Sequence, residues 1–140
     1  MKRIGLVINP VAGMGGSVGL KGTDGNVEEA RRRGAIPHAA DRARAALAHL
    51  ITTPGLTFLT ASGAMGGDVL AGAGIPDVRV VYHYTGESST ADTKDAVRAF
   101  LREGVDLVLF CGGDGTARDV FDVTGRDLPI LGIPAGVKMY

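Results

Sequence analysis

Residues 106–116 read Asp-Leu-Val-Leu-Phe-Cys-Gly-Gly-Asp-Gly-Thr. The run from Asp106 to Phe110 is almost entirely apolar, which is typical of a central strand in a parallel sheet that is covered on both faces. Three glycines around one aspartate follow at 112–115, and the residues through Phe121 have the pattern of a short helix. The stretch therefore predicts a strand, a tight turn and a helix in direct succession, the repeating unit of α/β folds.

The rest of the chain alternates in the same way. Apolar runs predict further strands at 4–8, 56–60, 78–82 and 128–133. One helix is predicted to begin at Pro37, and another to run from the capping box of Ser89 to Gly104. Glycine-rich stretches to about Ala35 and at 63–74 predict loops, the second with one helical turn near Val69. The pattern predicts a three-layer, Rossmann-like open parallel sheet of about five strands, with helices on both faces.

The length of 140 residues indicates one domain, so the α/β pattern is assigned to a single domain spanning residues 1–140. Hydrophobic residues make up 45% of the chain, and 15 basic residues balance 15 acidic ones. This balance argues against a nucleic-acid partner, because such proteins usually carry a basic excess. No apolar run is long enough for a secretion signal or a membrane span, and the single cysteine, Cys111, fits a reducing compartment. We therefore expect a cytoplasmic protein with neither membrane nor nucleic acid as a partner.

Asp114 is the candidate catalytic residue. Parallel sheets bind ligands at the carboxyl ends of their strands, glycines let backbone N–H groups approach phosphate, and a helix N-terminus favours an anion. A carboxylate among such donors would bind Mg²⁺, or accept a proton or hydrogen bond from a reacting hydroxyl. The alternative is a plain glycine turn in which Asp114 caps the helix, which three glycines around one acid fit less well.

Two more glycine-containing clusters near the N-terminus are candidates for phosphate binding. Residues 9–16 read Asn-Pro-Val-Ala-Gly-Met-Gly-Gly after the first strand and predict a second phosphate cradle, or else a flexible loop with a polar strand cap. Residues 21–25 read Lys-Gly-Thr-Asp-Gly and offer a cation and a hydroxyl, or form a surface turn. Arg118 is placed to reach a phosphate, or to form a salt bridge with Asp119 or Asp122.

The motif Gly112-Gly113-Asp114-Gly115-Thr116 resembles the signature of NAD kinases, diacylglycerol kinases and phosphofructokinases. The clusters at 9–16 and 21–25, the extension of the signature to Asp119 and the ending at 132–139, Gly-Ile-Pro-Ala-Gly-Val-Lys-Met, narrow the resemblance to the ATP-NAD kinase family. Within it, the chain is similar to the branch that includes proteins like the acetoin-catabolism protein X. These motifs cover nearly the whole chain.

The resemblance implies the N-terminal, nucleotide-binding domain of an ATP-dependent kinase that phosphorylates the adenosine-ribose 2′-hydroxyl of NAD. Asp114 would be catalytic, Mg²⁺ or another divalent cation would accompany ATP, and the protein would form dimers or tetramers. The implied nucleotide- and phosphate-binding residues are Asn9, Gly13, Gly15, Gly16, Lys21, Thr23, Asp24, Gly112, Gly113, Gly115 and Thr116, with Arg118 as a further candidate.

The resemblance also indicates what is missing. Family members continue into a β-rich C-terminal domain with an asparagine-acid motif that contacts NAD, and no such domain follows here, so we expect an N-terminal fragment whose site is incomplete. Three alternatives stay open: a kinase of this fold with another small hydroxyl acceptor, a nucleotide-binding module without catalysis, and polyphosphate in place of ATP as the donor.

Overall fold

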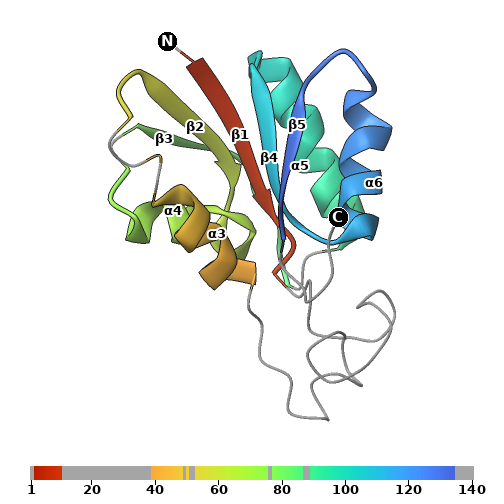
Figure 1. Cartoon of the computed structure of the whole chain (residues 1–140). Coiled ribbons are helices and arrows are strands. Elements are labelled where there is room, and N and C mark those ends of the chain that lie inside the picture. The colour runs from red at the N-terminus through yellow and green to blue at the C-terminus, as the bar shows by residue number, and fades with distance from the viewer. Residues whose placement is uncertain are drawn as a thin grey trace, which may run out of the picture.

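The computed structural model describes residues 2–10, 39–48, 50, 53–75, 77–86 and 89–134. They form an open sheet of parallel strands between two layers of helices (Figure 1). The strands are Lys2–Ile8 (β1), Leu56–Ala61 (β2), Val78–Tyr82 (β3), Leu107–Gly112 (β4) and Ile130–Pro134 (β5). The helices are Ala39–Leu47 (α3), the short 3₁₀-helix Gly63–Met65 (η1), Gly67–Gly72 (α4), Thr90–Glu103 (α5) and Asp114–Thr124 (α6). The predicted three-layer α/β fold is confirmed.

The five strands run in the order β3-β2-β1-β4-β5, and every pairing is parallel. The chain moves from β1 to β2 and β3 on one side, then returns to place β4 and β5 on the other side. The direction of winding therefore reverses between β1 and β4. In open α/β sheets this reversal leaves a crevice at the carboxyl ends of the two strands, where ligands bind.

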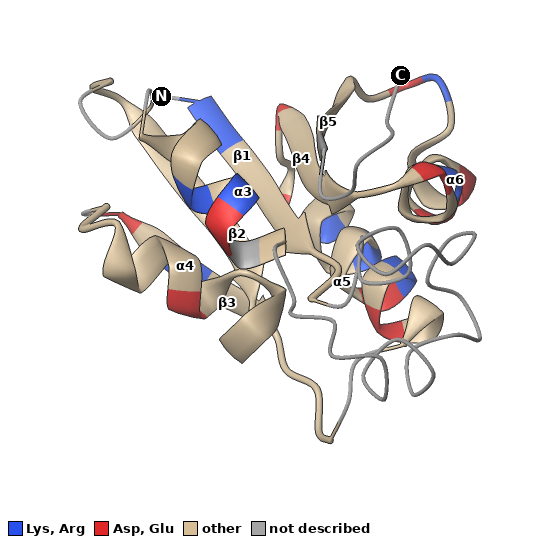
Figure 2. Ribbon diagram, turned by 60° about the horizontal axis from the view of Figure 1, so that its bottom comes forward, with Lys and Arg blue, Asp and Glu red and all other residues tan. Residues whose placement is uncertain are grey.

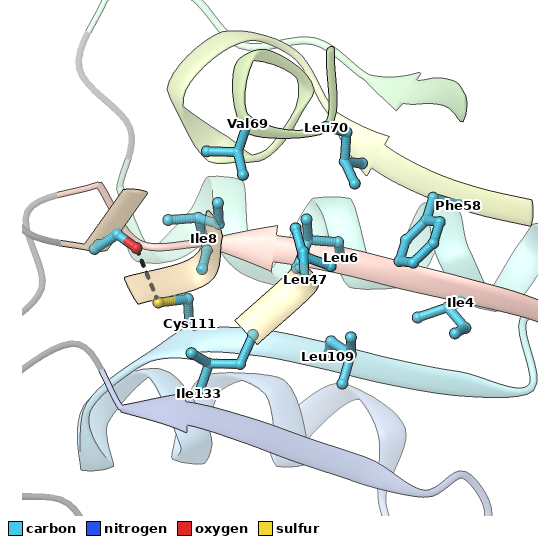
Figure 3. Close-up of a cluster of buried hydrophobic side chains, with 12 residues drawn as sticks. Ile4, Leu6, Ile8, Leu47, Phe58, Val69, Leu70, Leu109, Cys111 and Ile133 are labelled. Atoms are coloured by element: carbon cyan, nitrogen blue, oxygen red, sulfur yellow. Dashed lines mark hydrogen bonds between the residues drawn. The ribbon is translucent and has the colours of Figure 1, made fainter. Parts of the chain in front are cut away.

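Each face of the sheet has its own apolar core. Successive side chains of β1 alternate between the faces, so that Leu6 and Ile8 pack beneath α3 and α4 while Val7 packs beneath α5 and α6. Figure 3 shows the first of these cores, where Leu47 of α3 and Leu70 of α4 meet the strands. Covering both faces explains why β4 is apolar along its length and why β1 is apolar from Ile4 onward.

Helix α5 begins and ends where the sequence predicts. The Ser89 hydroxyl accepts the N–H of Asp92, and the Asp92 carboxylate accepts the N–H of Ser89, which completes the capping box. Gly104 ends the helix in the left-handed conformation, with a φ of 77°, which a side chain would disfavour. Within the described residues, no helix combines the length and the apolar character needed to cross a bilayer.

The segment 63–74 is more helical than its glycine content predicts. Instead of a loop with one helical turn, η1 and α4 follow each other with only Gly66 between them. Met65, Val69 and Leu70 are buried, so packing against the sheet outweighs the weak helix propensity of glycine. The predicted turn at 112–115 is also shorter than its glycines suggest. Strand β4 extends to Gly112 and helix α6 begins at Asp114, so that only Gly113 lies between them.

Candidate active site at the ends of β1 and β4

Two motifs that are far apart in the sequence meet at the point where the winding reverses. Asn9 follows β1 directly, and its backbone N–H donates to the carbonyl of Cys111 in β4 at 2.9 Å. The Asn9 side chain reaches further, and its Nδ2 donates to Oγ1 of Thr116 in α6 at 3.2 Å. The structure thus brings Asn9, the first residue of the predicted phosphate-binding cluster at 9–16, into contact with Thr116, the last residue of the motif at 112–116.

The two adjacent glycines of the turn have different surroundings. A Cβ on Gly112 would lie only 2.3 Å from Thr116 Oγ1, so the buried strand end has no room for a side chain. A Cβ on Gly113 would meet no atom of the described residues within 4 Å, and the φ of −105° at Gly113 is open to any residue. Gly112 is therefore required by packing, whereas the space beside Gly113 is open to a ligand.

Helix α6 starts at this open space without a capping side chain. Gly113 is its N-cap and has no side chain to bond the first N–H groups, whereas Ser89 caps α5. Unpaired N–H groups and the positive end of the macrodipole attract an anion to such a helix end. Asp114 lies in the first turn and is exposed. The site therefore combines donors for phosphate with one accessible carboxylate.

Among the described residues, the charged side chains of the helices around this helix end are of both signs. Figure 2 shows acidic and basic residues mixed along α3, α5 and α6. Arg118, in the second turn of α6, is exposed and has no ion-pair partner within the described ranges, and Asp122 pairs with Lys94 at 3.4 Å. Arg118 is thus available to an anion, while the backbone of α6 supplies the attraction closest to Gly113.

A divalent cation that accompanies ATP would meet one exposed carboxylate, that of Asp114, in the first turn of α6. Among the described residues, no three His, Cys, Asp or Glu side chains gather into a group able to hold a metal ion. Mg²⁺ often binds through one or two carboxylates together with substrate phosphates. The exposed Asp114 beside an anion-binding helix end fits that arrangement.

The remaining predicted residues fall into two groups. Gly115 lies in the first turn of α6, next to Asp114 and Thr116. The residues of the second cradle and the lysine cluster, Gly13, Gly15, Gly16, Lys21, Thr23 and Asp24, lie outside the described part of the chain. The structure also brings in a neighbour that the residue pattern did not assign to the site, because the end of β5 pairs with Gly112 through Pro134. This neighbour could not be predicted from the residue pattern, because it depends on the position of β5 beside β4 in the sheet.

The comparison with known proteins agrees with this geometry. A family model described as the ATP-NAD kinase N-terminal domain matches residues 4–140. The chain belongs to this family. Neither the curated proteins nor the solved structures contain a significant match. Membership in the ATP-NAD kinase family supports a kinase role with nucleotide binding, and the family generally uses ATP and a divalent cation.

Proposed function

We propose that the protein transfers the terminal phosphoryl group of ATP to the 2′-hydroxyl of the adenosine ribose of NAD, giving NADP and ADP. The observation that carries this proposal is the position of Asp114. It is an exposed carboxylate in the first turn of an uncapped helix, directly after Gly113, where the winding of the sheet reverses. Family membership supports the choice of a nucleotide as the substrate.

The residues around Asp114 suit phosphoryl transfer to a hydroxyl. The first N–H groups of α6 and the open space at Gly113 would receive the transferring phosphoryl group. Asp114 would accept the proton of the attacking hydroxyl as the new bond from oxygen to phosphorus forms and the bond to the departing ADP breaks. Such transition states are loose, so positioning matters more than the strength of the base. A divalent cation, when bound, would neutralise phosphate charge beside Asp114.

The product decides between this proposal and the alternatives. The protein expressed from its complete reading frame is incubated with ATP, Mg²⁺ and NAD, and NADP is measured. We expect NADP to form at an initial rate that is proportional to the enzyme concentration. A folded protein that makes no NADP overturns the proposal. A different phosphorylated product in a screen of hydroxyl acceptors would indicate another acceptor, activity with polyphosphate alone would indicate another donor, and nucleotide binding without turnover would indicate a binding module.

The catalytic role of Asp114 has a matched control in the same helix. We expect Asp114→Asn to lower kcat by about 10²–10⁴-fold, because the amide cannot accept the proton. Asp122→Asn, two turns further along α6 and also exposed, should keep activity near that of the wild type. Circular dichroism of both variants checks that the fold is kept. If Asp114→Asn retains most of the wild-type rate, another residue is the base.

A further inference from the structure

Thr116 is buried, although its motif predicts contact with phosphate. Only 5% of its surface is exposed, whereas Asp114, two residues earlier in the same turn, is exposed. Its Oγ1 accepts the hydrogen bond from Asn9 Nδ2, and its side chain occupies the space that a side chain at Gly112 would need. The hydroxyl is therefore directed at the strand ends and is engaged with the protein.

The contacts of Thr116 join three elements. The bond to Asn9 holds α6 to the residue that follows β1, and the close approach to Gly112 seats the same turn on the end of β4. The atoms of Thr116 that a Cβ on Gly112 would meet are Oγ1 at 2.3 Å, Cβ at 2.5 Å and Cγ2 at 2.8 Å. The whole Thr116 side chain therefore fills the space over Gly112, and it packs the first turn of α6 directly on the end of β4.

We propose that Thr116, together with Asn9, is a positioning residue that holds the first turn of α6, and with it Asp114, against the ends of β1 and β4. On this proposal Thr116 does not bind phosphate itself. The inference rests on the proposed function only in that Asp114 is the group being positioned. Misplacing a catalytic group by about 1 Å can cost on the order of 10²-fold in rate, so the bond has a measurable catalytic consequence.

The variants separate the hydroxyl from the shape of the side chain. Thr116→Val removes the hydroxyl and keeps the volume, Thr116→Ser keeps the hydroxyl, and Asn9→Ala removes the donor. Thr124→Val is the matched control, because Thr124 lies in the same helix and is 6% exposed, and its hydroxyl bonds locally to the carbonyl of Gly125 at 3.2 Å. The kcat for NADP formation and the KM for ATP and for NAD are measured for each, together with the urea midpoint.

The two roles predict different kinetics. For a positioning role, Thr116→Val and Asn9→Ala each lower kcat by about tenfold or more and change both KM values by less than about threefold. The double variant is no worse than the poorer single variant, Thr116→Ser recovers most of the rate, and Thr124→Val stays near the wild type. A tenfold rise in the KM for ATP with kcat kept, or losses that multiply in the double variant, would indicate direct phosphate binding and overturn the inference.

A second measurement separates failure of this inference from failure of the proposed function. If the wild type makes no NADP, the urea midpoints of Asn9→Ala, Thr116→Val and the double variant still form a cycle. Shifts that do not add, with an unchanged dissociation constant for ATP in Thr116→Val, support the positioning pair. Shifts that add fully, or a weakened affinity for ATP in Thr116→Val, overturn it whatever the acceptor is.

Discussion

At the scale of the residue, Gly112 and Gly113 show how much a motif leaves undetermined. The order of glycines and aspartate predicted an anion site with one acidic group, and the structure places Asp114 accordingly at the start of α6. The pattern could not predict that the two glycines have different roles, because this depends on Thr116. The Thr116 side chain fills the space over Gly112, whereas no described atom lies within 4 Å of a Cβ on Gly113. Packing that arises only in the folded state is not visible in the order of residues.

The open space at Gly113 leads to a prediction about binding without loss of fold. We expect Gly113→Ala to weaken the affinity for ATP with Mg²⁺ by about tenfold or more, because the new methyl group stands where the phosphate approaches. The free energy of unfolding should fall by only about 1 kcal/mol, because alanine is a poorer N-cap than glycine but its methyl group would meet no described atom within 4 Å. Calorimetric titration and urea unfolding measure the two effects.

The control is Gly72→Ala. Gly72 also has open space around its Cβ position and lies in α4, away from α6. This variant should bind ATP like the wild type. Equal affinities in both variants would place the phosphate away from Gly113.

At the scale of the element, local signals were sufficient for α5, which has a cap at each end. The ends of α5 could be predicted from Ser89 and Gly104, because capping involves only neighbouring residues. The helix α4 was underestimated for the opposite reason. Its glycines obscure the helical period, and it is stabilised by burial of Val69 and Leu70 against the sheet. Contacts between elements that are distant in sequence therefore account for what the pattern missed.

The contact between β1 and α5 leads to a prediction about stability. A Cβ on Gly5 would lie 2.5 Å from Cδ2 of Phe100, and Phe100 is fully buried, so its ring has no free space to enter. We expect Gly5→Ala to lower the free energy of unfolding by about 1–3 kcal/mol through overpacking. Urea unfolding checks this, with Gly72→Ala as the control. Adding Phe100→Leu should recover part of the loss in Gly5→Ala, and a fully stable Gly5→Ala would contradict the packing of α5 on β1.

The junction of β3 and α5 leads to a prediction about pH. The hydroxyl of Tyr82 donates to Asp92 at 2.5 Å; this bond lowers the pKa of Asp92 and raises the pKa of Tyr82 to about 12. A lowered carboxyl pKa stabilises the fold above the ordinary value of 3.8, and this stability is lost as the pH falls through the folded pKa. Tyr82→Phe should therefore be less stable than the wild type by about 1 kcal/mol near neutral pH.

The difference between Tyr82→Phe and the wild type should shrink below pH 4, where Asp92 is protonated in the unfolded chain and then in the folded one. Urea midpoints between pH 7 and pH 2 measure it. Tyr84→Phe, at a tyrosine two residues further along, is the control and should show no such dependence. A difference that stays constant down to pH 2 would mean that the charge on Asp92 is not involved.

At the scale of the whole molecule, the strand order makes the site. Alternation of strands and helices predicted a parallel sheet, but not that β1 would lie at its centre between β2 and β4. That order brings Asn9 to Thr116 across 107 residues of sequence. No local pattern encodes such a contact, since it depends on how the crossovers place all five strands. The sequence could therefore predict candidate residues after β1 and after β4, but it could not predict which of them are in contact.

The single cysteine reports on the integrity of this three-layer assembly. Cys111 is buried between β4 and α3, and its thiol donates to the carbonyl of Ala39 at 3.3 Å (Figure 3). Burial raises the pKa of the thiol to about 12, although the nearby Arg42 acts in the opposite direction. We expect a thiol reagent at pH 8 to leave the folded protein unmodified and to label one thiol per chain in urea. Rapid labelling of the folded protein would contradict the packing of α3 on the sheet.

The same thiol fixes the sign of a pH effect on the whole fold. The thiol ionises near pH 9 in the unfolded chain but stays protonated to about pH 12 in the folded one, so its contribution to stability is fully present below pH 9 and declines above it. Cys111→Ala lacks this titration, while every other group is shared with the wild type. The free energy of unfolding of the wild type, minus that of Cys111→Ala, should therefore be constant from pH 6 to 8 and fall steadily from pH 9 to 11. Urea unfolding at each pH measures this difference, and a difference that rises with pH would mean that the thiol is ionised in the folded core.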